Sequence, residues 1–533
     1  MTNNRAVPIY STPVISVGGL SLPRTRTLVV AIFLIGLLPL LSTPLLPFID
    51  LYNHLARYFV LSHLDDSALL RQNYEANWSL LPNIGLDVIG TLVLRFLPPA
   101  LAAHVAVIGI FAVQYSGILY FNRALTGRTS PLVALLIVPL LYSFILNWGF
   151  ANFLFGLGLV FWAAGWWLSQ RHRLAVALPV ACLFAVLIFL AHGLTFALYG
   201  ILVGTLEIGL FLQRKPKRVG ALVGAMIPLL VQAVIPVAMF ALTTTSHSQG
   251  GLTNADESIG RLSAAGHLSA RLWDLFCYRM TTIVRVEEGP VLWLDIATFV
   301  LQAAIIGLLL SRGRLQIARP AWPAIIVGAI LVVIMPPALF GVGYVADRMP
   351  LFLAMIVVGA LKPRLRGDAL DIGAVAVLAL VVAARLAAIA IGWQGYAADY
   401  AEFRAVAAQV PPGMLVDDVI VGGSHHDSDR PRCQMYRPLM VSLFGQIGPL
   451  FANETQQPLR LVGPLRKAVD ALPGGFAWGN LRQGYYDDVI ADSGRAGFRY
   501  LLICNAGLLT RPFPANSRVV TQTSSFTLLR LGA

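Results

Sequence analysis

The stretch "TLVVAIFLIGLLPLLSTPLL", residues 27–46, contains no Asp, Glu, Lys or Arg. A helix needs about 20 such residues to cross the ~30 Å hydrocarbon core of a bilayer. Directly after it comes "PFIDLYNHLARYFVLSHLDD", residues 47–66, in which Asp50, Asn53, His54 and Arg57 recur at helical spacing. The chain is therefore expected to leave a membrane and at once present a helix with ionisable side chains.

Composition extends that expectation to the whole chain. Of its 533 residues, 57% are hydrophobic and 12% are charged, and the mean hydropathy is +0.73. Soluble domains carry about 25% charged residues, so the chain is expected to be a multi-pass membrane protein. Its net charge of +13 does not indicate nucleic acid, because the basic residues lie mainly in short loops between apolar runs, where they report topology.

Eleven apolar runs are long enough, or nearly so, to be membrane spans. They cover 28–47, 101–122, 131–147, 150–169, 174–191, 194–212, 219–242, 290–310, 321–340, 348–361 and 370–392. A further run at 84–99 is short and contains Asp87 and Arg95. It is predicted to be an interfacial or re-entrant helix.

Basic residues predict the orientation of these spans. The alternate connections carry Arg or Lys, and they contain Arg24, Arg26, Arg123, Arg128, Arg171, Arg173 and the segments 213–218, 311–319 and 362–368. By the positive-inside rule, these connections and the N-terminus are cytoplasmic. The outer loops are then 48–100 and 243–289, and residues 393–533 lie outside the cell membrane, in bacteria the inner membrane.

The two ends of the chain differ in composition from its middle. Residues 1–27 form a cytoplasmic tail without clear periodicity, which is expected to be disordered. After residue 392, "YAADYAEFRAVAAQVPPG" (396–413) predicts a helix ended by Pro-Pro-Gly. The segments at 414–423, 498–505 and 517–531 predict strands. The fold class is therefore an all-α transmembrane bundle, 28–392, with a small extracytoplasmic α/β domain, 393–533. Cys433 and Cys504 could pair there, which the sequence does not decide.

Polar residues gather at the predicted outer ends of the spans. Asp50, His54 and Arg57 share one helix face, with Asn53 beside them. The residues expected to join them are Asn147, Asn152, His192, Asp347 and Arg348. Ionisable groups at membrane depth usually face a cavity or each other, so one outward-facing polar cavity is predicted. The plainer alternative is that Asp50 is the N-cap of its helix.

This set of residues fits transfer of a sugar from a lipid phosphate. A carboxylate such as Asp50, with His54 beside it, can act as general base toward an acceptor hydroxyl. An arginine can hold the phosphate through charge-assisted hydrogen bonds while it leaves. Arg57 and Arg348 are the candidates for that role, and the remaining polar residues are expected to contact substrate.

At these residues the chain resembles a known superfamily. The segments "DLYNHLARYFVL", "NWGFANFLFGLGL", "AHGLTF" and "ADRMPLFL" are similar to those of a group of bacterial membrane proteins with the architecture of C-type (GT-C) glycosyltransferases. The resemblance implies that Asp50 is the catalytic base and that the donor is a polyprenyl-phosphate-linked sugar. The acceptor would be an envelope glycan, lipid or protein. An acidic pair common in the superfamily is replaced here by "IDL", so dependence on a divalent metal stays open.

Two other functions remain compatible with the sequence. The same cavity could carry a lipid or solute in a transporter or flippase, or the chain could be a non-catalytic envelope assembly protein. The motif "GGSHHDSDR" (422–430) is more often a solvated turn than a metal site, so no metal ligands are assigned. P-loop, HExxH and G-x-S-x-G patterns are absent from the sequence.

Overall fold

The computed structural model describes residues 16–17, 20–21, 25–243, 268–339, 342–421, 433–450, 457–472, 480–481, 486–505, 513 and 516–532. Most of the predicted tail 1–27, part of the predicted outer loop 243–289 and the whole 422–430 motif lie outside these residues. Within the tail, β1 (Ser16–Val17) and β2 (Leu20–Ser21) pair antiparallel.

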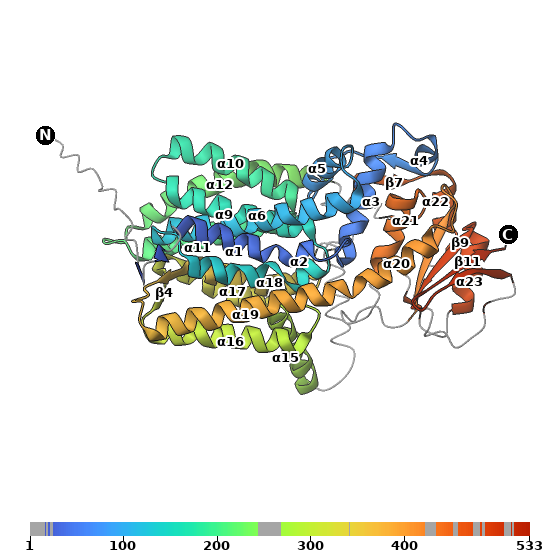
Figure 1. Ribbon diagram of the computed structural model, residues 1–533. Helices are drawn as coiled ribbons and strands as arrows, with labels where there is room; N and C mark the ends of the chain where they lie inside the picture. The colour runs from blue at the N-terminus through green and yellow to red at the C-terminus, as the bar shows by residue number, and fades with distance from the viewer. Residues whose placement is uncertain are drawn as a thin grey trace.

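The larger part of the chain is a bundle of helices that run side by side (Figure 1). A helix is found at each of the eleven predicted positions. These are α1 (Thr25–Gly36) with α2 (Leu38–Leu41), α6 (Pro99–Thr126), α7 (Pro131–Leu141), α9 (Ala151–Gln170), α10 (Leu174–Ala191), α11 (Gly193–Leu212), α12 (Val219–Leu242), α16 (Leu292–Ser311), α17 (Trp322–Ile334), α18 (Val345–Ala360) and α19 (Ala369–Gln394). Among the described helices, seven are long and apolar enough to cross a membrane. The prediction of a multi-pass membrane protein is confirmed.

The helices that fall short of this length are α1, α7, α17 and α18. In two of them a proline accounts for the early end, because proline lacks the backbone N–H that a helix interior uses. Pro39 marks the break between α1 and α2, and Pro139 lies in the last turn of α7. The predicted span 131–147 is consequently divided into α7 and the short α8 (Phe144–Asn147).

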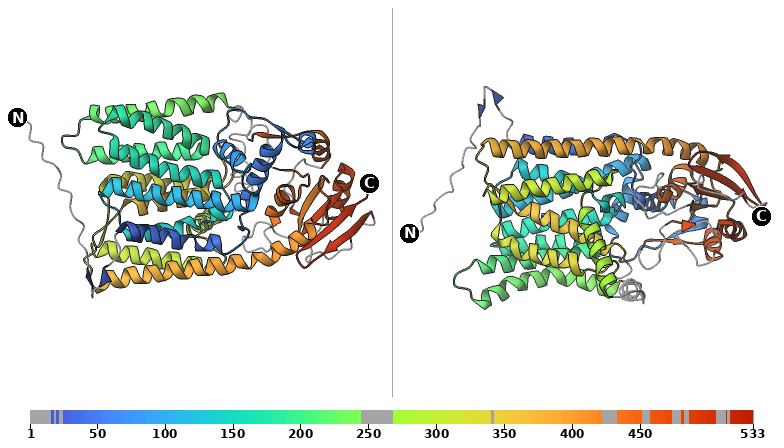
Figure 2. Two further views of the ribbon diagram at one scale, coloured as in Figure 1. Left: turned by 45° about the horizontal axis from the view of Figure 1, so that its top comes forward. Right: turned by 90° about the horizontal axis from the view of Figure 1, so that it is seen from below.

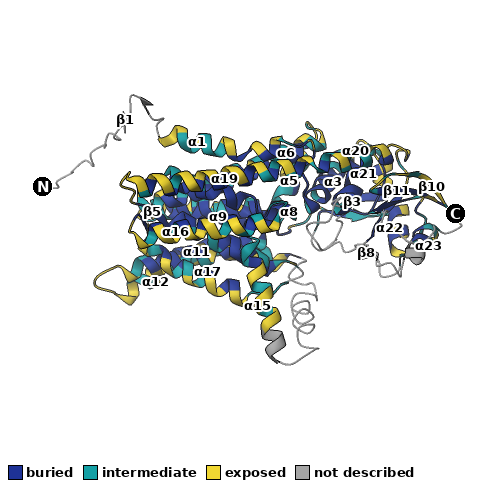
Figure 3. Cartoon of the chain, turned by 60° about the horizontal axis from the view of Figure 1, so that its bottom comes forward, coloured by how far each residue is buried: buried dark blue, intermediate teal, exposed yellow. Residues whose placement is uncertain are grey.

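Small residues allow the central helices to approach closely. A Cβ atom built on Gly117 of α6 would lie 2.6 Å from the carbonyl oxygen of Gly158 in α9. Glycine at such a crossing is a common device in membrane bundles. The outer faces of the bundle are apolar and exposed (Figure 3), as at Leu230 of α12 and Leu380 of α19, which are 67% and 70% exposed. Hydrocarbon covers such faces in a bilayer.

The C-terminal part is an α/β domain beyond one end of the bundle (Figures 1 and 2). Its sheet has the order β10–β11–β9–β6–β8. The strands are β6 (Val416–Val421), β8 (Asn480–Leu481), β9 (Tyr500–Cys504), β10 (Ser517–Gln522) and β11 (Phe526–Leu531). β6 pairs in parallel with β8 and β9, and β9–β11 and β11–β10 are antiparallel. The predicted fold class is confirmed.

Helices cover this sheet and connect it to the bundle. They are α20 (Tyr396–Ala407), which follows α19 almost without a break, α21 (Tyr436–Phe444), α22 (Gly463–Asp470) and α23 (Tyr486–Ala496). A disulfide between Cys433 and Cys504 joins the start of α21 to β9. The sequence left that pairing open.

One helix belongs to both parts of the protein. α3 (Ile49–His63) follows the first span, and its Leu51 and Leu55 pack in the core of the bundle. Its Ala56 and Val60 pack in the core of the C-terminal domain. After it come α4 (Ala68–Asn73), β3 (Tyr74–Ala76), which pairs with β7 (Leu459–Leu461), and α5 (Gly85–Val93). Helix α3 is therefore fixed from two sides, and α5 is the predicted interfacial helix.

Candidate active site

Asp50 lies in the first turn of α3, at the end of the bundle that adjoins the C-terminal domain (Figure 1). The N-cap residue of this helix is Phe48, and no side chain caps it. The alternative prediction that Asp50 is the N-cap is therefore wrong. The backbone N–H of Asp50 donates to the carbonyl of Trp148 at 2.8 Å, whereas its carboxylate makes no hydrogen bond to any described residue. The carboxylate is thus available to a ligand.

The surroundings of Asp50 favour a base that titrates near neutrality. Burial raises the pKa of Asp50 to about 7, and the positive charges of Arg348 and Arg57 oppose that rise. A general base is most effective when its pKa is close to the working pH. Asp50 lies outside the membrane-spanning helices, in a helix shielded by two folded parts.

Arg57, two turns after Asp50, is held by a carboxylate. It is fully buried, and its Nε donates to Oδ1 of Asp87 in α5 at 2.6 Å. Its Nη2 lies 3.0 Å from Nδ1 of His54. Because a guanidinium can only donate hydrogen bonds, this nitrogen of His54 is the acceptor. Arg57 thus fixes His54 and contributes a positive charge that cannot easily move toward a ligand.

Arg348, at the start of α18, is buried without such a partner. Its Nη1 lies 3.1 Å from Nε2 of His192, and its guanidinium lies over the rings of Phe150 and Phe153, 4.7 and 5.0 Å from their centroids. The Nε atom has no hydrogen-bond partner. Nδ1 of His192 lies 3.2 Å from the N–H of Leu194. Both neighbours of the ring are donors and a neutral imidazole has one acceptor nitrogen, so His192 accepts from only one of them at a time.

A comparison of the buried arginines makes Arg348 distinctive. In the described part of the chain these are Arg57, Arg314, Arg348, Arg385 and Arg437. The other four each form an ion pair, with Asp87, Asp368, Asp295 and Asp418 respectively. Arg348 has no carboxylate within the same 4 Å limit among the described residues. A buried cation is stable only when it is compensated, so this arrangement fits an anion that is brought in as ligand.

Three other residues predicted for the site, Asn152, Asn53 and Asp347, differ in their contacts. Asn152 belongs to its wall: its Nδ2 donates to the carbonyl of Asn83 at 2.8 Å, and its Oδ1 lies 3.5 Å from the hydroxyl of Tyr58. Asn53 is fully buried, and neither of its amide atoms has a hydrogen-bond partner. Asp347 accepts from the hydroxyl of Tyr278 at 2.9 Å.

Asn147 supports the turn whose Trp148 carbonyl binds the backbone N–H of Asp50. Its Nδ2 donates to Oε1 of Glu288 at 3.0 Å, and the Asn147–Gly149 turn presses on the start of α3. Gly149 has φ +80, and a Cβ atom there would lie 2.5 Å from the backbone nitrogen of Leu51. Asn147 thus acts on the site through the backbone, without contacting its centre.

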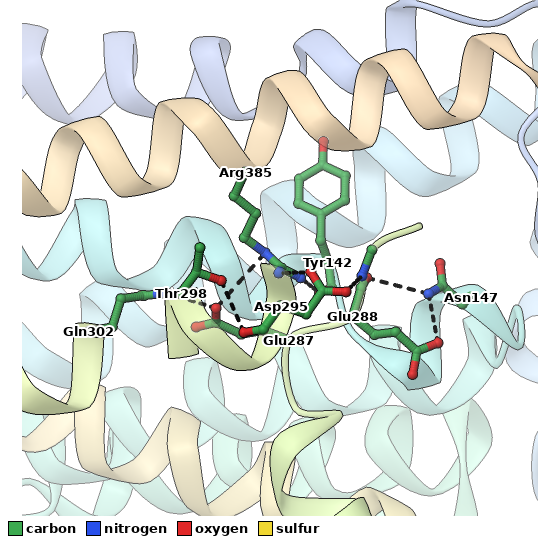
Figure 4. Close-up of polar contacts among 9 residues, drawn as sticks. Tyr142, Asn147, Glu287, Glu288, Asp295, Thr298, Gln302 and Arg385 are labelled. Carbon is green, nitrogen blue, oxygen red and sulfur yellow. Dashed lines mark hydrogen bonds and ion pairs between the residues drawn. The ribbon is translucent and has the colours of Figure 1, made fainter. Parts of the chain in front are cut away.

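Figure 4 shows the network behind Asn147. Arg385 of α19 pairs with Asp295 of α16, its Nη2 donates to the carbonyl of Tyr142 at 3.2 Å, and its Nε lies 3.8 Å from Glu287. Asp295 also accepts from the N–H of Gly289 at 2.7 Å. The loop that presents Glu288 is therefore anchored to two membrane helices. Asp295 and Arg385 are ionisable residues inside the apolar runs 290–310 and 370–392. From the sequence, such residues could have indicated a buried polar network.

Backbone strain borders the same region. Tyr344, which precedes α18, has φ 56, and Asn83 has φ 79. Tyr344 interacts electrostatically with Asp50 and lies 4.5 Å from the ring of Trp148, centroid to centroid. Left-handed backbone is costly for a residue with a large side chain, and such strain gathers at functional sites.

Two apolar cavities adjoin the two histidines. The His192 cavity, about 270 Å³, is bounded by His192, Phe189, Phe196, Ala197, Phe240 and Val345 among others. The His54 cavity, about 240 Å³, lies between α3, α5, α6 and α9 and is bounded by His54, Leu55, Tyr58, Ile89, Gly109 and Phe155 among others. They share no lining residue. In the residues that the structure covers, no cluster of three or more His, Cys, Asp or Glu is placed to hold a metal ion.

Comparison with known proteins adds little to this geometry. No family model matches the chain, and no curated protein matches its sequence. Among solved structures, the chain is similar to that of ArnT from Cupriavidus metallidurans bound to undecaprenyl phosphate. The TM-score is 0.48 and the sequence identity 14%, over 95% of this chain and 97% of that one. At those values the likeness carries no conclusion about what this chain does.

Proposed function

We propose that this protein is a membrane glycosyltransferase that moves a sugar from a polyprenyl phosphate to an envelope acceptor on the outer face of the membrane. The observation that carries the proposal is the electrostatic interaction between Asp50 and Arg348, which form no ion pair. A carboxylate without a hydrogen-bond partner, with a pKa of about 7, lies within the electrostatic reach of a buried guanidinium that lacks a carboxylate partner in the described chain. Asp50 would then provide a base and Arg348 an anion site for one reaction.

Each residue then has a chemical role. Asp50 takes the proton from the acceptor hydroxyl, whose oxygen forms a bond to the anomeric carbon of the sugar. The bond from that carbon to the phosphate oxygen breaks, and the negative charge that remains on the phosphate is stabilised by Arg348. Attack from the side opposite the phosphate inverts the anomeric configuration. His54, one turn after Asp50 and held by Arg57, orients the acceptor.

Arg348 is a better phosphate ligand than Arg57, the other candidate from the sequence. The Nε of Arg57 is already committed to Asp87, and removing one member of a buried ion pair is costly. Arg348 can gain a charge-assisted hydrogen bond without losing an ion pair, because no carboxylate of the described chain lies within 4 Å of it. The His192 cavity begins at the histidine that contacts Arg348, so it is the natural place for the isoprenoid chain of the donor.

The outer location of the site has two independent supports. Disulfides form and persist in extracytoplasmic compartments, and Cys433–Cys504 lies in the domain next to the site. The basic connections after α6, α9 and α11 lie at the opposite end of the bundle, together with the start of α1 (Figure 1). The positive-inside rule makes that end cytoplasmic.

Two variants and a control test this function. Asp50→Asn removes the base but leaves the anion site, so donor binding should persist while transfer falls about 10²–10⁴-fold. Arg348→Gln should weaken binding of undecaprenyl phosphate at least tenfold in native mass spectrometry of the purified protein. Arg364→Gln is the matched control, because Arg364 is exposed at the other end of the bundle.

The outcomes separate the candidate functions. Normal product formation by Asp50→Asn would exclude Asp50 as base. Equal undecaprenyl phosphate binding by the wild type, Arg348→Gln and Arg364→Gln would remove the donor site and favour an assembly role. Transport of a lipid across the membrane by Asp50→Asn at the wild-type rate, without any transfer by the wild type, would instead favour a flippase.

A further inference from the structure

The His54 cavity has no role in the donor half of the reaction. It is separated from the His192 cavity, and its walls come from α3, α5, α6 and α9. Apart from His54 and Tyr58, all its lining residues are apolar. It therefore matches an apolar chain and cannot by itself hold a sugar or a peptide with several polar groups.

Exposed apolar residues form part of the rim of this cavity, and hydrocarbon can cover them in a bilayer. Val105 on α6 is 46% exposed and Ile89 on α5 is 49% exposed, and both line the cavity. α6 is one of the helices long and apolar enough to cross the bilayer. What reaches an apolar opening on such a helix is a lipid chain, since neither water nor a folded protein occupies that depth.

The inner end of the cavity leads to the base. His54 lines it, and His54 is one helical turn from Asp50 on the same face of α3. The Trp148–Phe150 turn, which holds the N–H of Asp50, leads directly into Ala151 and Phe155 of the cavity wall. A chain in this cavity would therefore carry its headgroup toward Asp50 along walls that share no residue with the His192 cavity.

We propose that the His54 cavity binds the hydrocarbon chain of the acceptor, which is then a membrane lipid with a hydroxyl in its headgroup. The proposal rests on the glycosyltransferase function proposed above and names its acceptor class. The lipid hydroxyl loses its proton to Asp50 and gains the sugar, and the donor phosphate leaves on Arg348. Two apolar chains enter from two sides, and their headgroups meet at one carboxylate.

The charges decide which chain takes which cavity. The arginine that contacts His54 is Arg57, which is neutralised by Asp87 at 2.6 Å. A phosphate there would find no uncompensated cation. Arg348, beside the His192 cavity, is the buried arginine of the described chain that lacks a carboxylate partner. The phosphate-linked donor therefore belongs with His192, and the acceptor with His54.

Glycine positions allow each cavity to be filled separately. Gly109 of α6 lines the His54 cavity, and no atom lies within 4 Å of a Cβ built on it. Gly109→Leu therefore places a side chain in the cavity without a clash. Gly224 of α12 is equally open but lines neither cavity, so Gly224→Leu is the matched control. Ala197→Leu fills the His192 cavity in the same way.

The experiment uses the full chain in nanodiscs of phosphatidylethanolamine and phosphatidylglycerol that contain a phospholipid with a diazirine in its acyl chain. Cross-links are mapped by mass spectrometry. The wild type and Gly224→Leu should be labelled at the cavity residues Val113 and Phe155, and Gly109→Leu should lose at least 80% of that labelling. Binding of undecaprenyl phosphate should be unchanged in Gly109→Leu and reduced in Ala197→Leu.

A second readout separates this inference from the proposed function. Native membranes containing the wild type should yield the sugar on a lipid other than the polyprenyl phosphate donor, identified by its mass in the organic-solvent fraction, and Gly109→Leu should reduce that product at least tenfold. Equal labelling of Val113 and Phe155 in Gly109→Leu and wild type overturns the acceptor site. Sugar found only in protein or polysaccharide overturns a lipid acceptor but leaves the transferase intact. No difference in transfer between wild type and Asp50→Asn overturns the transferase itself.

Discussion

The carbonyl oxygen of Trp148 accepts the backbone N–H of Asp50 at 2.8 Å, so a tight turn between α8 and α9 holds the start of the candidate catalytic helix. The first N–H groups of a helix have no partner inside it, and here one of them binds this turn. The position of the carboxylate thus depends on residues almost 100 positions away in the sequence. Several expected outcomes follow from that dependence and from the charges around it.

Replacement of Gly149 by Ala should disturb Asp50 directly. The residue has φ +80, and the added Cβ would lie 2.5 Å from the backbone nitrogen of Leu51, which cannot move without shifting α3. We expect at least a 100-fold loss of transfer, together with about 1–3 kcal/mol of lost stability. Gly127→Ala is the control, because Gly127 has the same φ of +80 but no atom within 4 Å of its added Cβ. It should lose stability alone, measured by thermal unfolding, and equal loss of activity in both variants would contradict this account.

The activity should depend on pH through Asp50. The groups that face it are Arg57 on its own helix, and Arg348 and Tyr344 at the start of α18, and burial raises its pKa to about 7. Only the ionised carboxylate accepts a proton, so kcat/KM should fall tenfold per pH unit below this value and level off above it. A profile that is flat between pH 5 and 8 would exclude Asp50 as the titrating base.

The same shift predicts the pH dependence of stability. The pKa of Asp50 is higher in the folded state than its unfolded value near 3.8, so the folded protein binds the proton more tightly. Its contribution to the free energy of unfolding is therefore fully present below about pH 4 and is lost as pH rises through 7. The melting temperature of Asp50→Asn minus that of wild type should therefore be larger at pH 8 than at pH 4. An equal difference in melting temperature at both values would show that Asp50 is not buried.

The bundle, the C-terminal domain and the helical setting of Asp50 follow from local patterns. Apolar runs of about 20 residues can satisfy their backbone only as helices in a membrane, and short segments rich in Val and Ile such as 414–423 form strands. The Arg57–Asp87 pair could not be predicted in this way. Asp87 lies 30 residues from Arg57, in a run that looks interfacial, and pairing depends on how α5 packs against α3. The two cavities are likewise properties of packing between helices.

Breaking the Arg57–Asp87 pair should cost more than replacing it. Asp87→Asn leaves a fully buried guanidinium without its charge partner, which is expected to cost about 3–5 kcal/mol. The double variant Arg57→Met, Asp87→Leu removes both charges and should recover most of that stability, because apolar residues of similar volume replace buried ion pairs well. Thermal unfolding in detergent measures both. A double variant less stable than Asp87→Asn would show that the charges themselves hold α5 on α3.

Removal of the disulfide should lower the stability of the C-terminal domain. Cys433 and Cys504 are separated by 71 residues, and closure of a loop of that length is worth about 4 kcal/mol in the chain-entropy description. The pair Cys433→Ser, Cys504→Ser should therefore lower the unfolding temperature of the domain, and a reducing agent should do the same to wild type. Cys182→Ser is the control, because Cys182 is a free cysteine in α10. A melting temperature that dithiothreitol does not change would contradict a closed disulfide.

Glu288 should act on the rate through the position of Asp50. Its carboxylate accepts from Nδ2 of Asn147 at 3.0 Å and from Nε of Arg285 at 2.5 Å. In Glu288→Gln one of these two donors would face an NH₂ group, so the turn that binds the N–H of Asp50 should shift. We expect kcat to fall about 10–100-fold with KM nearly unchanged and with the pH midpoint near 7 retained, because the base itself is still present.

Glu207 of α11 offers a matched control for that prediction. It is also a buried carboxylate between two donors, Nε1 of Trp167 at 2.8 Å and Arg171, but it lies toward the other end of the bundle. Glu207→Gln should therefore lose a similar amount of stability and keep kcat, measured as transfer by equal amounts of folded protein. If both variants lose kcat in proportion to their stability, Glu288 is a structural residue. A loss of kcat confined to Glu288→Gln makes it a positioning residue, which acts on the base through Asn147 and the carbonyl of Trp148.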